Sequence, residues 1–521
     1  MVQIKNLHYK WIVMMIVMIG ILMSVLDSSI VNISIPAMMA DFGASVEDIQ
    51  WVITAYMLSF AALMPLTSWF RDRIGYKTLY LFSLALFTVG SLLCAMAWSL
   101  PSLIVARVLQ AIGGGAITPT AMAMITEVFE PKERGKAMGL FGLGIIIGPI
   151  FGPTLGGFLT KFFGWRSIFT INLPIGILGY FLASALLRKD EPHTLKKVSF
   201  DFWGFIFLTL FLVFMMLAIS KGQQKGWTSS YIVWCTIISS VSFVLFSLTE
   251  SLVEHPIIDY TIFKFPVFNV CMLISAVRSI ALFGGIFLIP LFLQQIKGLD
   301  EIESGLILIP GALIVAVMLP FTGRMSDKIS PRLLSFVGMG FIAVFMWMYT
   351  GIQAQMTDWD IIFPTLVRGL GMSLLMAPVM VTAMNSVPNN KAGTASSLLS
   401  IIQQVAGAVG IAILSTILKN RTVFHMSNLQ TATTSVTSTA QNSIHGLVNY
   451  FHNAGYTYGT SMSGARTMLS MHVYHVAAVQ AFQDAFWVGF WIIVVSILPI
   501  WLMPKRPFTQ GHGPKEAMVG E

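Results

Sequence analysis

The sequence predicts an all-α polytopic membrane protein with fourteen transmembrane helices, arranged as two six-helix bundles with two extra central helices. Of its 521 residues, 56% are hydrophobic and only 10% are charged, whereas a soluble protein carries about 25% charged residues. Apolar runs of about 20 residues, the length that spans a bilayer as a helix, recur along the whole chain. In addition, a charged motif in the first half of the chain returns in the second half.

The expected spans follow these apolar runs. They cover residues 12–34, 50–69, 79–98, 102–125, 137–160, 166–187, 202–220, 230–249, 267–292, 304–323, 333–352, 361–383, 395–418 and 485–503. The first span is not expected to be a cleavable signal peptide, because its apolar part is too long and contains Asp27. The three cysteines all fall within spans, so neither a disulfide framework nor a metal site is expected.

Lysine and arginine residues predict the orientation, because cytoplasmic loops are enriched in them. With both termini in the cytoplasm, most of the 31 lysines and arginines lie on the cytoplasmic side. The net charge of +8 therefore reflects topology, and nucleic acid is not expected as a partner.

An internal repeat predicts the domain organisation. The segment PLTSWFRDRI, which starts at Pro65, has a counterpart PFTGRMSDKI that starts at Pro320, so that Asp72 aligns with Asp327. Duplicated halves with a site between them are typical of transporters, and chance similarity of two helix–loop junctions is the alternative. The expected parts are an N-terminal bundle (1–187), a linker with two extra helices (188–266), a C-terminal bundle with an external loop at 419–484 (267–504) and a cytoplasmic tail (505–521).

Asp27 is the most informative single residue, because no other acidic residue lies deep within an expected span. An ionised carboxylate in the bilayer is costly and usually has a function. A carboxyl group can take up and release a proton, so Asp27 is a candidate proton carrier. The alternative is a structural carboxylate that pairs with a buried arginine or a helix end.

Two arginines occupy related spans of the two halves, Arg107 and Arg368. A guanidinium group does not lose its proton in a protein, so neither residue can carry the proton itself. Each can change partner when a carboxyl group is protonated. Gln110 lies on the same helix face as Arg107, and the three residues Asp27, Arg107 and Gln110 form the candidate proton-coupling site. A structural role for Arg107 is the alternative.

Other polar or polarizable side chains within spans are candidates for a substrate cavity, with core packing as the alternative for the methionines. They are Asn32, Asn172, Arg278, Arg368, Met372 and Met376. His472 and His475 are too weak a pattern to predict a metal site, and no cofactor is expected.

The segment from Ser68 to Lys77 is expected to be a cytoplasmic loop between the second and third spans. Its acidic residue can contact helix ends, where charge–dipole interactions are favourable. It is therefore a candidate conformational latch, and a simple topological anchor is the alternative. The residues of this latch are Asp72, Arg73, Gly75, Lys77 and, in the repeat, Asp327.

The stretch GLGIIIGPIFGPTLGGFL, which starts at Gly142, contains glycines at every fourth position. In a helix they form one smooth stripe, and such stripes let membrane helices approach closely. We expect a bendable contact between the two bundles, with a static packing face as the alternative. The residues are Gly144, Gly148, Pro149, Gly152, Pro153, Gly156 and Gly157.

Together these motifs resemble the major facilitator superfamily, specifically its fourteen-span drug:proton antiporters. The residues Asp72, Arg73, Gly75 and Lys77 match the loop motif of that superfamily, although Ser68, Phe70 and Tyr76 depart from it. The segment from Arg107 to Gly113 is similar to the fourth-span motif that the family ties to proton transfer. Segments 26–36 and 164–176 resemble further motifs of the fourteen-span branch, and the glycine-rich stretch resembles the antiporter motif of exporters.

This resemblance implies proton-driven efflux of lipophilic or cationic toxic compounds by alternating access. The protein would lie in the bacterial inner membrane as a multi-pass protein. The long external segment at 419–484 resembles the branch that works with a periplasmic membrane-fusion protein and an outer-membrane channel. The alternatives are export of a specific metabolite such as a fatty acid or a siderophore, uptake, and a membrane sensor. An enzyme is not expected, because the sequence contains no cluster of catalytic residues at a membrane face.

Overall fold

The structure, a computed structural model, describes residues 2–190, 200–253, 256–388, 391–432 and 438–505. The first half consists of α1 (Val2–Phe42), α2 (Val46–Leu63), α3 (Leu66–Ala95), α4 (Leu100–Val128), α5 (Arg134–Phe163), α6 (Ser167–Thr170) and α7 (Asn172–Leu186). The two central helices are α8 (Phe202–Lys225) and α9 (Ser230–Leu252), followed by the short η2 (Tyr260–Lys264). The second half consists of α10 (Pro266–Gln295), α11 (Glu301–Ser326), α12 (Pro331–Tyr349), α13 (Asp358–Asn385), α14 (Ala392–Ala432), α15 (Ser438–Asn453), α16 (Tyr458–Val495) and η4 (Leu498–Leu502).

The all-helical prediction is confirmed. Twelve helices in the described part of the chain are long and apolar enough to cross a membrane. Helix α2 is also apolar, over Asp48–Leu63, but it is shorter than these twelve. Helix α5 covers the expected span 137–160. Every expected span therefore overlaps a helix of the structure.

The expected loop between the second and third spans, Ser68–Lys77, is mostly helical, but the break in the backbone lies within it, at Gly75. The second helix ends at Leu63 rather than at residue 69, and α3 already begins at Leu66. Pro65 lies between them and has no backbone N–H with which to continue α2. Around Pro65 the backbone stays helical. At Gly75, φ of +79° and ψ of 168° interrupt α3, a conformation that only glycine adopts readily.

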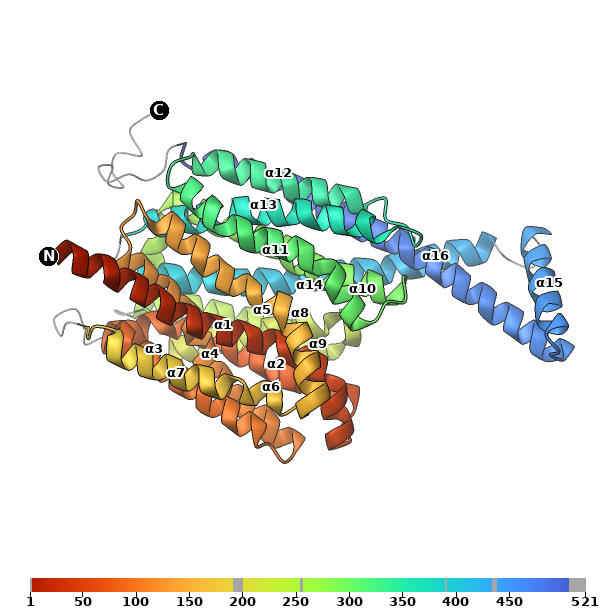
Figure 1. Ribbon diagram of the computed structural model, residues 1–521, viewed down its shortest axis with the longest axis horizontal. Coiled ribbons are helices and arrows are strands. Elements are labelled where there is room, and N and C mark those ends of the chain that lie inside the picture. Colours follow the sequence, from red (N-terminus) through yellow and green to blue (C-terminus); the bar gives the residue numbers. More distant parts are fainter. Residues whose placement is uncertain (1, 191–199, 254–255, 389–390, 433–437, 506–521) are drawn as a thin grey trace.

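The segment 419–484, which was expected to be an external loop, is mostly helical in its described part. Helix α14 continues to Ala432, α15 follows, and α16 already begins at Tyr458. Both α14, with 41 residues, and α16, with 38 residues, exceed the length that a bilayer needs. In Figure 1, α15 and the outer part of α16 project away from the rest of the molecule, opposite the N-terminus.

The two halves lie side by side and meet through a few helices. Helix α5 of the first half packs along α11 and α13 of the second, and α14 packs on α3 and α4. The extra helices α8 and α9 pack on each other, and α8 also contacts α2 and α14. The extra pair therefore bridges the halves without entering either six-helix bundle.

Candidate functional site

Asp27 lies in the middle of the first half and accepts hydrogen bonds from three side chains. Its Oδ2 accepts from Arg107 Nη1 at 2.6 Å. Its Oδ1 accepts from Gln110 Nε2 at 2.8 Å and from Asn172 Nδ2 at 2.9 Å. Asp27 and Arg107 are each only 1% exposed. The structure thus brings together the residues of the expected coupling site and adds Asn172, which the sequence suggested for a cavity.

Four helices position this group of side chains, and close packing of α3 on α4 makes it possible. A β-carbon added at Gly90 would lie 2.5 Å from the Cα of Gln110. Because the two helices touch there, Ser91 on α3 reaches the same group. Its Oγ accepts from Gln110 Nε2 at 2.8 Å and from Asn172 Nδ2 at 3.4 Å. We refer to Asp27, Ser91, Arg107, Gln110 and Asn172 as the Asp27 network.

The guanidinium group of Arg107 has further partners that can hold it. Its Nη1 also donates to Gln110 Oε1 at 2.6 Å, and its Nε donates to the carbonyl oxygen of Val52 at 3.4 Å. The guanidinium carbon lies 3.9 Å from the centre of the Tyr56 ring, a cation–π distance. The arginine therefore keeps favourable contacts even when the carboxylate is neutralised.

Ser91 and Tyr56 are functional candidates that sequence reasoning missed. A serine or tyrosine within an apolar span gives no signal by itself, since a serine hydroxyl often bonds its own helix. Ser91 Oγ does donate to the carbonyl oxygen of Phe87 at 2.9 Å. Only the three-dimensional contact with Gln110 and Asn172 places Ser91 in the network.

The residues of the expected latch separate into two groups. In the first half, Asp72 pairs with its neighbour Arg71 at 2.6 Å. Lys77 Nζ donates to the carbonyl oxygens of Ser184 and Leu187 at 2.7 and 2.5 Å. Arg73 lies against the Trp69 ring. All of these contacts stay within the first half, so through them Asp72, Arg73 and Lys77 do not join the two halves.

Asp327, by contrast, reaches from the second half to the first. Its Oδ1 accepts from the backbone N–H of Gly135 at 2.8 Å, and its Oδ2 accepts from that of Lys136 at 3.3 Å. These amides belong to the first turn of α5, where a negative charge is stabilised. Burial raises the pKa of Asp327 to about 6, and Glu133 adds to this, while the hydrogen bonds from Gly135 and Lys136 oppose it.

Two more polar contacts join the halves at the same end of the molecule. Arg134 Nη1 donates to Asn385 Oδ1 at 2.6 Å, and the hydroxyl oxygens of Thr67 and Ser397 lie 2.5 Å apart. These residues lie at the helix ends that the lysine and arginine pattern assigns to the cytoplasm. At this end, the halves are therefore joined by three contacts: Asp327 bonds the first turn of α5, Arg134 bonds Asn385 of α13, and Thr67 bonds Ser397 of α14.

The glycine stripe does not lie between the two bundles, so that expectation is wrong. A β-carbon added at Gly148 would lie 2.7 Å from the backbone of Val25, and one at Gly156 would lie 2.9 Å from the carbonyl oxygen of Ile30. Both partners belong to α1 of the same half. Gly144 and Gly152 also face α1, and a β-carbon added at Gly157 would lie 3.8 Å from the Ile33 side chain. The side chains of Pro149 and Pro153 lie outside the described residues.

A different glycine face of α5 makes the contact with the second half. Added β-carbons at Gly135 and Gly139 would lie 2.2 and 2.6 Å from backbone carbonyl oxygens of α11. These glycines come one to three turns before the stripe along α5. The helix is thus smooth on one face for α1 and, near its start, smooth on another for α11.

The remaining candidates for a cavity do not form one group. Asn32 is exposed, whereas Met372 and Met376 are buried in the core, where Met376 packs near Gly142. Arg278 is buried and Arg368 is partly buried, in the second half. Core packing, the alternative for the methionines, therefore describes their surroundings.

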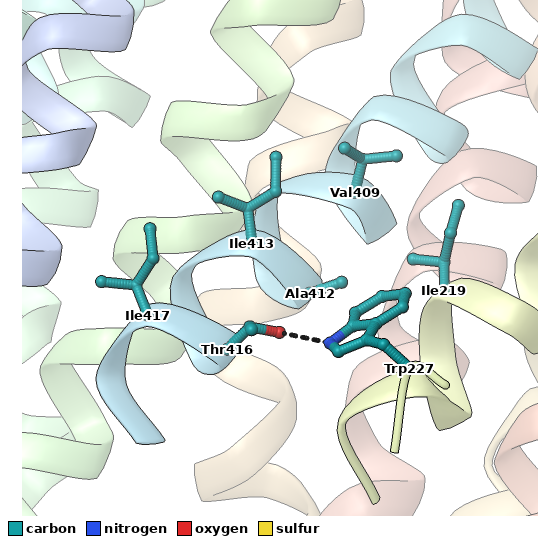
Figure 2. A pocket seen from close by; sticks show the side chains of 7 residues that line it. All are labelled: Ile219, Trp227, Val409, Ala412, Ile413, Thr416 and Ile417. Carbon is teal, nitrogen blue, oxygen red and sulfur yellow. Dashed lines mark hydrogen bonds between the residues drawn. The ribbon is translucent and has the colours of Figure 1, made fainter. Parts of the chain in front are cut away.

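An apolar cavity of about 270 Å³ lies elsewhere, between α8 and α14. Figure 2 shows that Trp227 closes one side of it, with the indole N–H donating to Thr416 Oγ1 at 3.2 Å. Its other lining residues are Ile219, Val409, Ala412, Ile413 and Ile417. It contains no residue of the Asp27 network.

Comparisons with known proteins agree with this arrangement. The family model of the Major Facilitator Superfamily matches residues 17–411. The chain is 32% identical to an uncharacterized MFS-type transporter, YhcA, of Bacillus subtilis, over 96% of this chain and 94% of that protein. It is 29% identical to the multidrug export protein EmrB of Haemophilus influenzae, over 94% of each chain. Among solved structures, the proton:xylose symporter XylE matches with a TM-score of 0.60 at 14% identity, over 95% of this chain and 96% of that one.

Proposed function

Since the chain belongs to the major facilitator superfamily and is a membrane transporter, we propose that it is a proton-driven exporter of lipophilic or cationic toxic compounds that works by alternating access. Its similarity to a multidrug export protein supports the export of such compounds. The single observation that carries the proposal is the buried Asp27 network, in which one carboxylate is held by three donors.

Protonation of Asp27 is the coupling step of this proposal. A proton that binds a carboxylate oxygen removes the negative charge, so Arg107 loses its ion-pair partner. The guanidinium group then keeps Gln110 Oε1, the Val52 carbonyl oxygen and the Tyr56 ring as partners. Because a buried ion pair and a buried lone cation differ greatly in free energy, the proton changes which packing of the first half is favoured.

The cross-half contact is the second element of the proposal. Alternating access requires α5 to separate from α11 at the cytoplasmic end and to return. Asp327 bonds the first turn of α5 across that contact, so breaking it exposes both the carboxylate and the amides to water. Asp327 and the first turn of α5 therefore act as a conformational latch. The sequence predicts this role for the loops of both halves, and the proposal assigns it to Asp327.

We extend the proposal to partners and location. The protein resides in the bacterial inner membrane with both termini in the cytoplasm, which fits the lysine and arginine pattern. At about 1.5 Å per residue, the 41 residues of α14 and the 38 residues of α16 extend well beyond a bilayer. Their outer parts and α15 form a projection that a periplasmic membrane-fusion protein can contact, which in turn would lead to an outer-membrane channel.

A transport assay tests the proposal. Purified protein in liposomes is given an inward-directed proton gradient, and the movement of a fluorescent lipophilic compound is followed. Asp27→Asn is expected to abolish gradient-driven transport while the protein still inserts. Asp41→Asn is the matched control, since Asp41 pairs with Arg166 at a surface where both side chains are 44% exposed. Undiminished transport by Asp27→Asn would exclude the proton role.

A susceptibility panel on cells that lack or overproduce the protein, with and without a protonophore, separates the two candidate classes of cargo. Broad, protonophore-sensitive resistance supports multidrug export. Resistance to no compound, together with release of one metabolite, supports the alternative of a specific exporter for a fatty acid or a siderophore.

A further inference from the structure

Arg368 is a cation that has no counter-ion among the described residues. It lies on α13, and its Nη1 is buried without a hydrogen-bond partner. Its nearest aromatic group is Phe345, with the ring centre 5.6 Å from the guanidinium carbon. The side chain as a whole is only partly buried. A buried guanidinium nitrogen without an acceptor is costly, so the arrangement calls for an acceptor that the described chain does not provide.

The internal repeat shows what is missing. Helices α10 and α13 of the second half correspond to α1 and α4 of the first. An interval of 258 residues, three more than the interval between Asp72 and Asp327, takes Asp27 to Gly285, Ser91 to Tyr349 and Gln110 to Arg368. In the first half, Gln110 donates to Asp27. In the second half, a β-carbon added at Gly285 would lie 3.3 Å from Arg368 Nη1. The second half therefore repeats the contact between the two helices, but with glycine in place of the carboxylate and arginine in place of the amide.

The described acidic residues of the second half do not replace that carboxylate, because each of them lies at a helix end or, like Asp484 within α16, is held by another partner. Asp358 pairs with Lys297, and Asp484 pairs with Arg421 and His425. Asp300, Glu303 and Asp360 take part in the caps of α11 and α13, and Asp327 bonds α5. The described part of the chain therefore leaves the place beside Arg368 open to a negative charge carried by a bound molecule.

A second cation strengthens the positive charge of this half. Arg278 on α10 is 2% exposed, and within the described ranges its Nε likewise has no hydrogen-bond partner. It lies two helical turns before Gly285 on the same face, about 10.5 Å along the helix. Two arginines without paired carboxylates make this region favourable for an anion and unfavourable for a cation.

We propose that Arg368, facing Gly285, is the binding site for the anionic head group of the cargo, so that the transporter accepts lipophilic carboxylates in preference to lipophilic cations. This inference rests on the proposed function, because it assigns a substrate class to the same transporter. The planar guanidinium group matches a carboxylate with parallel N–H···O bonds. Helix α13, which carries Arg368, also packs on α5 of the first half, so the site lies on a helix that takes part in the contact between the halves.

A binding experiment with two matched probes tests the proposal. Radiolabelled 2-naphthoate and 2-naphthyltrimethylammonium share an aromatic body and carry opposite charges. Each is equilibrated by dialysis with the full-length protein in lipid nanodiscs, and binding to empty nanodiscs is subtracted. The naphthoate is expected to bind about tenfold more tightly or better, the ratio that one charge-assisted hydrogen bond supplies.

Three variants assign the preference to Arg368. Arg368→Gln is expected to weaken naphthoate binding about tenfold and to leave the ammonium probe unchanged, whereas Arg368→Lys keeps most of the naphthoate affinity. Gly285→Asp supplies an internal carboxylate and is expected to displace the naphthoate even if Arg368→Gln fails to fold. Gly305→Asp is the matched control, because an added β-carbon at Gly305 has nothing within 4 Å.

Equal binding of both probes, or naphthoate binding that Arg368→Gln and Gly285→Asp leave unchanged, would overturn the inference. The assay uses no proton gradient, so it separates this inference from the proposed function. A transporter that remains proton-driven but binds the ammonium probe more tightly contradicts only the substrate class. A protein that binds naphthoate as expected but transports without a proton gradient contradicts only the coupling.

Discussion

Gly135 of the first half and Gly323 of the second approach so closely that a β-carbon added to either would lie 2.2 or 2.3 Å from the backbone carbonyl oxygen of the other. The halves therefore meet backbone to backbone where α5 begins. Asp327 lies beside this contact and bonds the amide of Gly135 at 2.8 Å. A contact of this kind has little tolerance for added volume, because the opposing atoms belong to the backbone and cannot rotate away.

Gly323→Ala is expected to separate α5 from α11 at this end. Overpacking of a close contact costs about 1–3 kcal/mol, which shifts the equilibrium away from the closed arrangement by about fivefold or more. Spin labels on the cytoplasmic ends of α5 and α11 should report a longer distance by pulsed electron resonance. Gly340→Ala, where an added β-carbon meets nothing within 4 Å, should leave the distance unchanged. An unchanged distance in both variants would contradict the tight contact.

The same contact is expected to depend on pH. The pKa of Asp327 is raised from 3.8 to about 6 when the halves are in contact, so the contact binds the proton more tightly than the separated halves do. The closed arrangement is then favoured below about pH 4 and loses this advantage as the pH rises through 6. Labels on α5 and α11 should show a larger closed fraction at pH 5 than at pH 7.5. Asp327→Asn should flatten this profile, and a profile that persists in that variant assigns the effect to another group.

The ion pair of the Asp27 network should dominate the stability of the first half. Arg107→Met leaves a buried carboxylate without its partner, which costs about 3–5 kcal/mol. The melting temperature in detergent is expected to fall, and the double variant with Asp27→Asn should recover most of the loss. A double-mutant cycle isolates the coupling between the two side chains. Additive losses would show that the pair contributes no coupling.

The glycine stripe should be intolerant of side chains. Gly148→Ala places a β-carbon 2.7 Å from the backbone of Val25 on α1, and the expected cost is about 1–3 kcal/mol. Gly305→Ala, with open space around it, should be neutral or stabilising, because alanine is the better helix former. Thermal unfolding of the two variants side by side measures the difference. Equal melting temperatures would mean that α1 can move away from α5 at little cost.

The sequence predicts the fold well, because hydrophobic runs of membrane length have few alternatives. Helix ends and long polar helices were harder to predict. The segment at 419–484 is rich in serine, threonine and histidine, which favour turns as readily as helices, yet α14 and α16 continue through most of it. The break between the second and third spans lies at Gly75, within the segment that was expected to be a loop, but the charged residues before it are helical.

The candidate site was only partly predictable for a different reason. Asp27, Arg107 and Gln110 are conspicuous because polar side chains are rare in apolar spans. Asn172 was equally conspicuous, but nothing in the sequence indicates which polar side chains meet. In the sequence, Arg134 is one of many basic residues between spans, and its bond with Asn385 across the halves depends on how α5 packs against α13. Pairing between distant helices is a property of the packing, and a single sequence contains it only indirectly.

The 1% exposure of Asp27 has a kinetic consequence. A proton in water cannot reach a carboxylate that is enclosed by Arg107, Gln110 and Asn172 until these helices loosen and admit water. The exchange rate of that proton is then limited by helix motion, on the microsecond-to-millisecond timescale of such movements, rather than by the acidity of the group. Membrane lipids that stiffen the first half would therefore slow turnover without changing the strength of the driving gradient.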